Sequence, residues 1–155
     1  MIGSFYDAVK RPSWSPPRWV FVPILATFSA ARIWGDLRLF RSRKRKRALL
    51  ALEAVSWASF AAFAPAFFGL RSPRLGFASS VAHAATTIAS IALAPRVDGK
   101  AALALAPTAA WLGYALPLGA WIAARNADPF LGTQPIARKP LSRRARPALR
   151  ADARS

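Results

Sequence analysis

The residues best suited to chemistry lie in one stretch near the N-terminus, residues 5–21, where aromatic rings, prolines and cations alternate. Proline has a fixed φ and no backbone N–H, so three prolines keep this stretch out of a regular helix until its end. Trp14 and Trp19 carry amphipathic rings of the kind that sit at a membrane surface. The stretch predicts an extended loop that lies over one face of a helical bundle and then enters it.

Groups typical of catalytic and metal sites are scarce. The chain has no cysteine and a single histidine, His83. One histidine without cysteine and without a nearby carboxylate pair makes a poor metal site, so we predict no metal and no catalytic residue. We expect His83 to be a neutral, hydrogen-bonded packing residue. A role as proton carrier or ligand contact is the alternative, because ionisable groups inside a membrane are often functional.

Three other charged residues fall within apolar segments. Arg32 and Asp36 stand four residues apart and share one helix face, so they can pair near the membrane interface, with Arg32 extending its charged end toward the headgroups. Glu53 follows a basic run, residues 38–47, and a cation from that run could neutralise it. The basic run itself predicts a solvated loop beside anionic lipid.

Composition indicates a membrane protein. Of the 155 residues 54% are hydrophobic and only 19% are charged, and the mean hydropathy is +0.24. The net charge is nevertheless +17, which by itself would favour a nucleic-acid partner. The cations gather between apolar stretches and in the tail, as in proteins that face anionic headgroups. We therefore expect the lipid bilayer, and no nucleic acid, as the partner.

Four apolar stretches are long enough to cross a bilayer. We predict spans at about residues 17–40, 48–68, 75–93 and 101–124. The third is rich in Ala, Ser and Thr, which lets neighbouring helices approach closely. The fold class is therefore all-α: a polytopic transmembrane bundle of four spans, with the Pro/Trp-rich loop capping one face.

The chain divides into an N-terminal loop (1–18), the bundle (19–126) and a basic tail (127–155). The tail lacks apolar periodicity and is expected to be disordered. Both ends of the bundle are rich in Lys and Arg, so charge does not decide the orientation. The Ala- and Arg-rich composition suggests a multi-pass protein of a bacterial cell envelope.

Residues 10–21, KRPSWSPPRWVF, resemble the signature loop of the TspO/MBR family, the translocator protein or peripheral benzodiazepine receptor family. Further matches follow in order: the Phe5-Tyr6 pair, Pro23, Pro65 with Phe67-Phe68-Gly69, Pro107 with Trp111, and Asn126. The likeness covers roughly residues 5–126. The loop is quite specific, and the ordered spacing of the later matches adds to it.

The resemblance implies binding of flat hydrophobic ligands, porphyrins and sterols among them, in a cavity under the loop, with a transport or regulatory role. The residues that it places around the cavity are Trp14, Trp19, Phe63, Trp111 and Ala115, where Phe63 replaces the usual tryptophan. Arg18, with Lys10 and Arg11, could meet porphyrin propionates at the rim. No cofactor is required, and a porphyrin or haem-like ligand is the expected guest.

The chain departs from the family pattern in two ways. The family has five spans, and the span that precedes the loop is missing from this sequence. Residues that replace the usual aromatic or amide side chains are Leu25, Ser29, Phe60, Thr108 and Gly119. Two alternatives therefore stay open: a ligand-free assembly partner that completes its bundle as a homodimer, and a light-dependent porphyrin-degrading enzyme that relies on tryptophan photochemistry.

Overall fold

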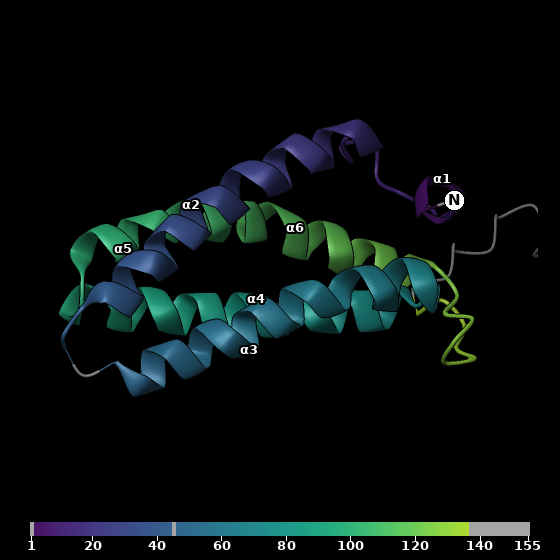
Figure 1. Cartoon of the computed structure of the whole chain (residues 1–155). Helices are drawn as coiled ribbons and strands as arrows, with labels where there is room; N and C mark the ends of the chain where they lie inside the picture. Colours follow the sequence, from purple (N-terminus) through teal and green to yellow (C-terminus); the bar gives the residue numbers. More distant parts are fainter. Residues whose placement is uncertain (1, 45, 137–155) are drawn as a thin grey trace, which may run out of the picture.

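The computed structural model describes residues 2–44 and 46–136, and the regular structure in these ranges is helical (Figure 1). The helices are α1 (Ile2–Ala8), α2 (Phe21–Arg41), α3 (Arg47–Ala64), α4 (Pro73–Leu93), α5 (Gly99–Ala104) and α6 (Ala106–Arg125). Three short turns adjoin them: 3-10 turns η1 (Arg18–Val20) and η3 (Ala94–Arg96), and a π-helical turn η2 (Pro65–Gly69).

Four segments are long and apolar enough to cross a membrane, namely Arg18–Arg41, Arg47–Gly69, Pro73–Arg96 and Gly99–Arg125. The predicted all-α bundle of four spans is confirmed. The fourth span is divided into α5 and α6 at Leu105, because Pro107 has no N–H with which to continue the helical ladder. Proline suits the first turn of the new helix α6, where that N–H would be unpaired anyway.

Helix α4 lies between α3 and α6 and packs on both, while α2 packs mainly on α5 and touches α6 (Figure 1). Small residues permit the closest approach. A Cβ atom on Gly35 of α2 would lie 2.8 Å from the Cβ atom of Ala104 and 3.2 Å from the carbonyl oxygen of Ala101. The backbone of α2 can reach α5 only because residue 35 has no side chain.

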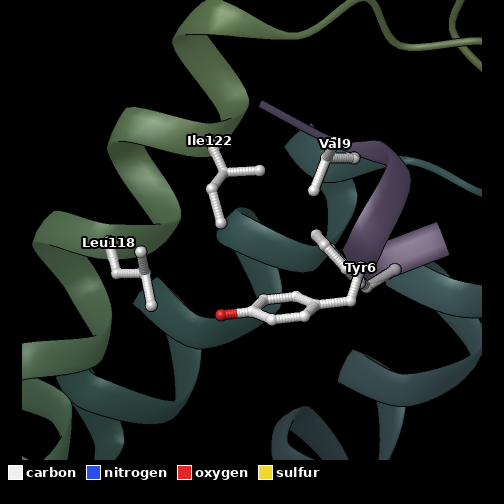
Figure 2. Packing of buried hydrophobic residues seen from close by; sticks show 5 residues of the cluster. Tyr6, Val9, Leu118 and Ile122 are labelled. Atoms are coloured by element: carbon white, nitrogen blue, oxygen red, sulfur yellow. The ribbon is translucent and has the colours of Figure 1, made fainter. Parts of the chain in front are cut away.

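An apolar cluster ties the N-terminal segment to the bundle. Tyr6 and Val9 face Leu118 and Ile122 of α6, and Phe67 of η2 completes the group (Figure 2). Residues 2–8 are helical, which differs from the loop that we predicted for residues 1–18. The sequence alone did not indicate this turn of helix, because the partner that buries its apolar face comes more than a hundred residues later.

Basic side chains close the opposite end of the bundle. Arg38 donates to Asp98 through Nη2, 2.8 Å from Oδ2, and this hydrogen bond is the main reason why the pKa of Asp98 lies below its ordinary value. The Lys46 ammonium donates to three carbonyl oxygens at the end of α2, at 2.5–2.6 Å. The predicted solvated loop 38–47 is thus shorter than expected, since α2 continues to Arg41 and α3 begins at Arg47.

The first residues of the predicted disordered tail are ordered. Asp128 and Thr133 exchange backbone hydrogen bonds of 2.8 and 3.1 Å, and the carboxylate of Asp128 accepts from the Ser72 hydroxyl at 2.6 Å and from the Arg74 N–H at 3.0 Å. Residues 127–136 therefore form a turn that caps the start of α4. No local sequence pattern predicts this turn. The remainder of that prediction, 137–155, lies outside the described residues.

Burial acts to raise the pKa of Asp128, but the hydrogen bonds donated by Ser72, Leu131 and Arg74 outweigh it and hold the pKa below its ordinary value. A depressed folded-state pKa stabilises the fold above the unfolded-state pKa of about 4, and this stabilisation is lost as the pH falls through the folded-state value.

We predict that Asp128→Asn is less stable than the wild type at neutral pH and loses less stability on acidification. The check is the thermal unfolding midpoint in detergent between about pH 7 and pH 3. Asp7→Asn is the control, because Asp7 makes only exposed ion pairs with Arg11 and Arg18 and such pairs contribute little. Parallel pH profiles for the wild type and Asp128→Asn would contradict the capping role.

Gly35→Ala tests the contact between α2 and α5. We expect it to lower the free energy of unfolding by about 1–3 kcal/mol, because the added methyl group overlaps Ala104. Gly113→Ala on α6 is the matched control: its Cβ atom would meet nothing within 4 Å, so it should be neutral or slightly stabilising. Equal unfolding midpoints for the two variants in detergent would show that α2 and α5 do not pack this closely.

Candidate functional site

A groove lies between the first half of α2 and the start of α6. Its volume is about 360 Å³, within the range of small-molecule sites. The residues that line it are Pro23, Ile24, Thr27, Phe28, Pro107 and Trp111. Its walls are apolar, and the Thr27 hydroxyl is already engaged with the Pro23 carbonyl oxygen at 2.8 Å. The groove thus offers ring faces and hydrocarbon to a guest.

Trp111 is the centre of a connected set of aromatic rings. Its ring stacks on Phe28, with centroids 6.2 Å apart and planes inclined by 26°, and meets the edge of Phe21 at 5.7 Å. On its other side Tyr114 lies at 5.6 Å, and Tyr114 in turn meets Trp14 of the loop edge-on at 5.7 Å. The loop therefore reaches the groove through Tyr114.

Three side chains, those of Tyr6 in α1, Tyr114 in α6 and Asn126, hold the backbone of the loop between α1 and α2. The Tyr114 hydroxyl donates to the Trp14 carbonyl oxygen at 3.1 Å, and the Tyr6 hydroxyl donates to that of Pro16 at 3.0 Å. Asn126, at the end of α6, accepts from the Lys10 N–H at 2.7 Å and donates to the Lys10 carbonyl oxygen at 3.0 Å. The proline-rich segment is thus held across one end of the bundle, over α6.

Residues 1–124 match the model of the TspO/MBR family. The chain belongs to the TspO/MBR family. It is 30% identical to the translocator protein of Ovis aries over 118 residues, which cover 74% of this chain and 70% of the relative. It is 33% identical to protein CrtK of Rhodobacter capsulatus over 119 residues (73% and 72%) and 24% identical to the tryptophan-rich protein TspO of Chlorobaculum tepidum over 114 residues (72% and 72%).

Family membership and the four spans make the chain an integral, multi-pass membrane protein. Lipid then surrounds the bundle, so the large apolar side chains exposed on α2, among them Val22, Trp34 and Phe40, face hydrocarbon or the headgroup boundary rather than water. Polar groups inside the bundle have no water within reach and must find partners in the protein.

The structure distributes the six predicted site residues of this TspO/MBR protein unevenly. Trp111 lines the groove, and Trp14 approaches it through Tyr114. Trp19 is 70% exposed, and Arg18 points to Asp7 at 3.3 Å, outside the groove lining. Phe63 and Ala115 are also outside the groove lining.

Phe63 stacks on Phe67, with centroids 5.5 Å apart, and so joins the cluster that holds the N-terminal segment. Ala115 is partly buried, one helical turn after Trp111. The apolar groove lies between α2 and α6, beside the loop. Of the residues that line it only Trp111 was predicted as a site residue; Pro23, Ile24, Thr27, Phe28 and Pro107 were not, and nothing local distinguishes Phe28 from the other apolar residues of α2.

The expected pairing of Arg32 with Asp36 is wrong. Arg32 is 1% exposed and donates to the Glu53 Oε2 atom through Nη2 at 2.6 Å and Nε at 3.0 Å. Asp36 instead accepts from the Trp57 indole at 2.7 Å. Arg32 does not extend toward the headgroups, and Glu53 is not neutralised from the basic run, because this face of α2 points inward at α3 and α4.

His83 is buried and hydrogen-bonded, as expected of a packing residue. Its Nδ1 atom lies 2.9 Å from the Ser56 hydroxyl and 3.1 Å from the Ser56 carbonyl oxygen. Within the described ranges, no group of three or more His, Cys, Asp or Glu side chains is placed to hold a metal ion.

Asn126→Ala is expected to loosen the loop, because both hydrogen bonds to the Lys10 backbone are lost. Hydrogen–deuterium exchange of peptides covering residues 9–18 should become faster, while exchange in α4 stays unchanged. Gln134→Ala is the control, since only the Gln134 backbone is engaged, through a 2.7 Å bond from Arg74. Unchanged exchange in the loop would show that Asn126 does not anchor it.

Proposed function

We propose that this membrane protein binds flat hydrophobic molecules of the porphyrin class in the groove between α2 and α6, with a transport or regulatory role. The observation that carries the proposal is the stack of Trp111 on Phe28 in the wall of a groove of about 360 Å³. Aromatic faces in an apolar groove favour a planar guest, because such a guest gains both area burial and ring contacts.

The lining supports recognition by shape more than by hydrogen bonds. Pro23, Thr27 and Pro107 are exposed, so the groove is open on one side, and a guest larger than the groove would project from it into lipid. At the loop end, Arg18 is 66% exposed at its side chain and bound only to the exposed Asp7. A carboxylate on the guest could compete for that guanidinium.

The names of the relatives support translocation rather than catalysis. Four of the matched proteins are called translocator protein, among them those of Ovis aries and Homo sapiens. Within the described ranges the groove lining contains no nucleophile beside a base and no carboxylate. A light-dependent reaction would therefore depend on Trp111 itself, and we propose ligand binding as the function.

We expect purified wild type in detergent to bind protoporphyrin IX and Trp111→Ala to bind it about tenfold more weakly, since about 1.4 kcal/mol of ring contact is lost. The measurement follows the visible absorption of the porphyrin, which does not depend on the number of tryptophans. Trp34→Ala is the control: Trp34 is on α2, one of the two helices that form the groove, and is half-exposed, but it lies beside Arg38, outside the groove lining.

Equal affinities of Trp111→Ala and Trp34→Ala would place any porphyrin elsewhere and contradict the proposed site. A wild type that binds no porphyrin and has the mass of a dimer in detergent would favour the ligand-free assembly partner. A monomeric mass with intact porphyrin binding would remove that alternative.

A further inference from the structure

A second set of polar side chains is buried between α2, α3 and α4, apart from the lining of the groove. Its members are Arg32, Asp36, Glu53, Ser56, Trp57, His83 and Thr87. All lie within membrane-spanning segments, and each of the four ionisable residues is at most 9% exposed. We call this set the polar cluster.

Two carboxylate oxygen atoms of the polar cluster have no hydrogen-bond donor. Arg32 donates to Glu53 Oε2 through Nε and Nη2 and to the Thr87 hydroxyl through Nη1 at 3.0 Å. The Trp57 indole N–H donates to Asp36 Oδ2. Glu53 Oε1 and Asp36 Oδ1 are buried and have no donor. The two carboxyl groups lie on consecutive turns of the same helix contact: Asp36 follows Arg32 by four residues on α2, and Trp57, which donates to Asp36, follows Glu53 by four residues on α3.

The charges of the polar cluster do not balance if both carboxyls are ionised. Arg32 supplies one positive charge against two negative ones. His83 supplies none: its Nδ1 lies beside the hydroxyl and carbonyl oxygens of Ser56 and its Nε2 is buried without a partner, so a doubly protonated ring would leave one N–H without an acceptor. One uncompensated negative charge would then remain inside the membrane, which is costly.

A single proton removes the excess charge. Two carboxyls buried beside one guanidinium cannot easily both ionise, and a proton on either one brings the net charge of the polar cluster to zero. The protonated carboxyl is then a donor as well as an acceptor.

We propose that Asp36 and Glu53 together bind one exchangeable proton inside the bundle, with Arg32 as the fixed counter-charge. This is a protonatable site independent of the groove and of any porphyrin. The ionisable groups around it are Arg32 from α2 and the neutral His83 from α4. Helix α5 packs on α2 at Gly35 through Ala101 and Ala104.

Asp36 is the member through which the proton exchanges. It lies about 8 Å along α2 from Arg41, at the basic end of the span, by the 1.5 Å rise per residue of a helix. The Trp57 indole joins Asp36 to α3, and the hydrogen-bonded groups Glu53, Arg32, Thr87, Ser56 and His83 lie further toward the middle of the bundle. The polar cluster thus leads from the basic face to the middle of the bundle.

The test is infrared spectroscopy of the full-length protein in detergent, in H₂O and in D₂O. We expect the wild type at neutral pH to show the carbonyl stretch of one protonated carboxylic acid, and this band to shift in D₂O. Asp36→Asn should abolish the band, because it removes one of the two negative charges and leaves ionised Glu53 balanced by Arg32. Asp98→Asn is the control: it removes a carboxylate outside the spans and should retain the band.

Glu53→Gln provides a second route should Asp36→Asn not yield a monodisperse protein. It leaves Arg32 and Asp36 as a balanced pair, so it should also abolish the band. The proposal is overturned if the wild type shows no protonated carboxyl band near neutral pH, if the band does not shift in D₂O, or if it survives in either variant. Loss of the band in Asp98→Asn would equally contradict it.

Discussion

The fold depends on one constraint: inside lipid, every polar group must find its partner within the protein. Helix α2 illustrates this most clearly. The pair formed by Arg32 and Glu53 joins α2 to α3, and the bond from Arg32 to Thr87 joins it to α4. Removing one member of such a buried pair leaves an uncompensated charge, which costs far more than the pair contributes by its presence. These residues therefore specify how α2 sits in the bundle.

At the two ends of the bundle, different groups supply the hydrogen-bond partners that the backbone carbonyl oxygens need. At the loop end, the carbonyl oxygens of a proline-rich segment are engaged by Tyr6, Tyr114 and Asn126, so an irregular backbone can lie across the helices. At the basic end, Lys46 and the Arg38–Asp98 pair fasten the helix termini. Both ends carry cations, and the apolar, aromatic groove begins near the loop end of α2.

The groove and the polar cluster are separate but adjacent. Phe60 of α3 lies 5.9 Å from Phe28 of the groove and 5.5 Å from the imidazole of His83. This TspO/MBR protein thus combines an apolar groove with charged groups buried one helical turn further along α2, from Phe28 to Arg32.

The sequence by itself determined the membrane class, the four spans, the loop and, through the order of its motifs, the family. These follow from local signals, because hydropathy, proline positions and motif spacing are read along one segment at a time. Trp111, which lines the groove, was predicted as a site residue from the family resemblance. Only the tertiary structure decided that Phe28 faces Trp111, that Trp19 lies outside the groove, and that Arg32 pairs with Glu53 rather than with Asp36. Each of these depends on the rotation of one helix against another, and a periodic apolar helix does not encode which of its faces meets which neighbour.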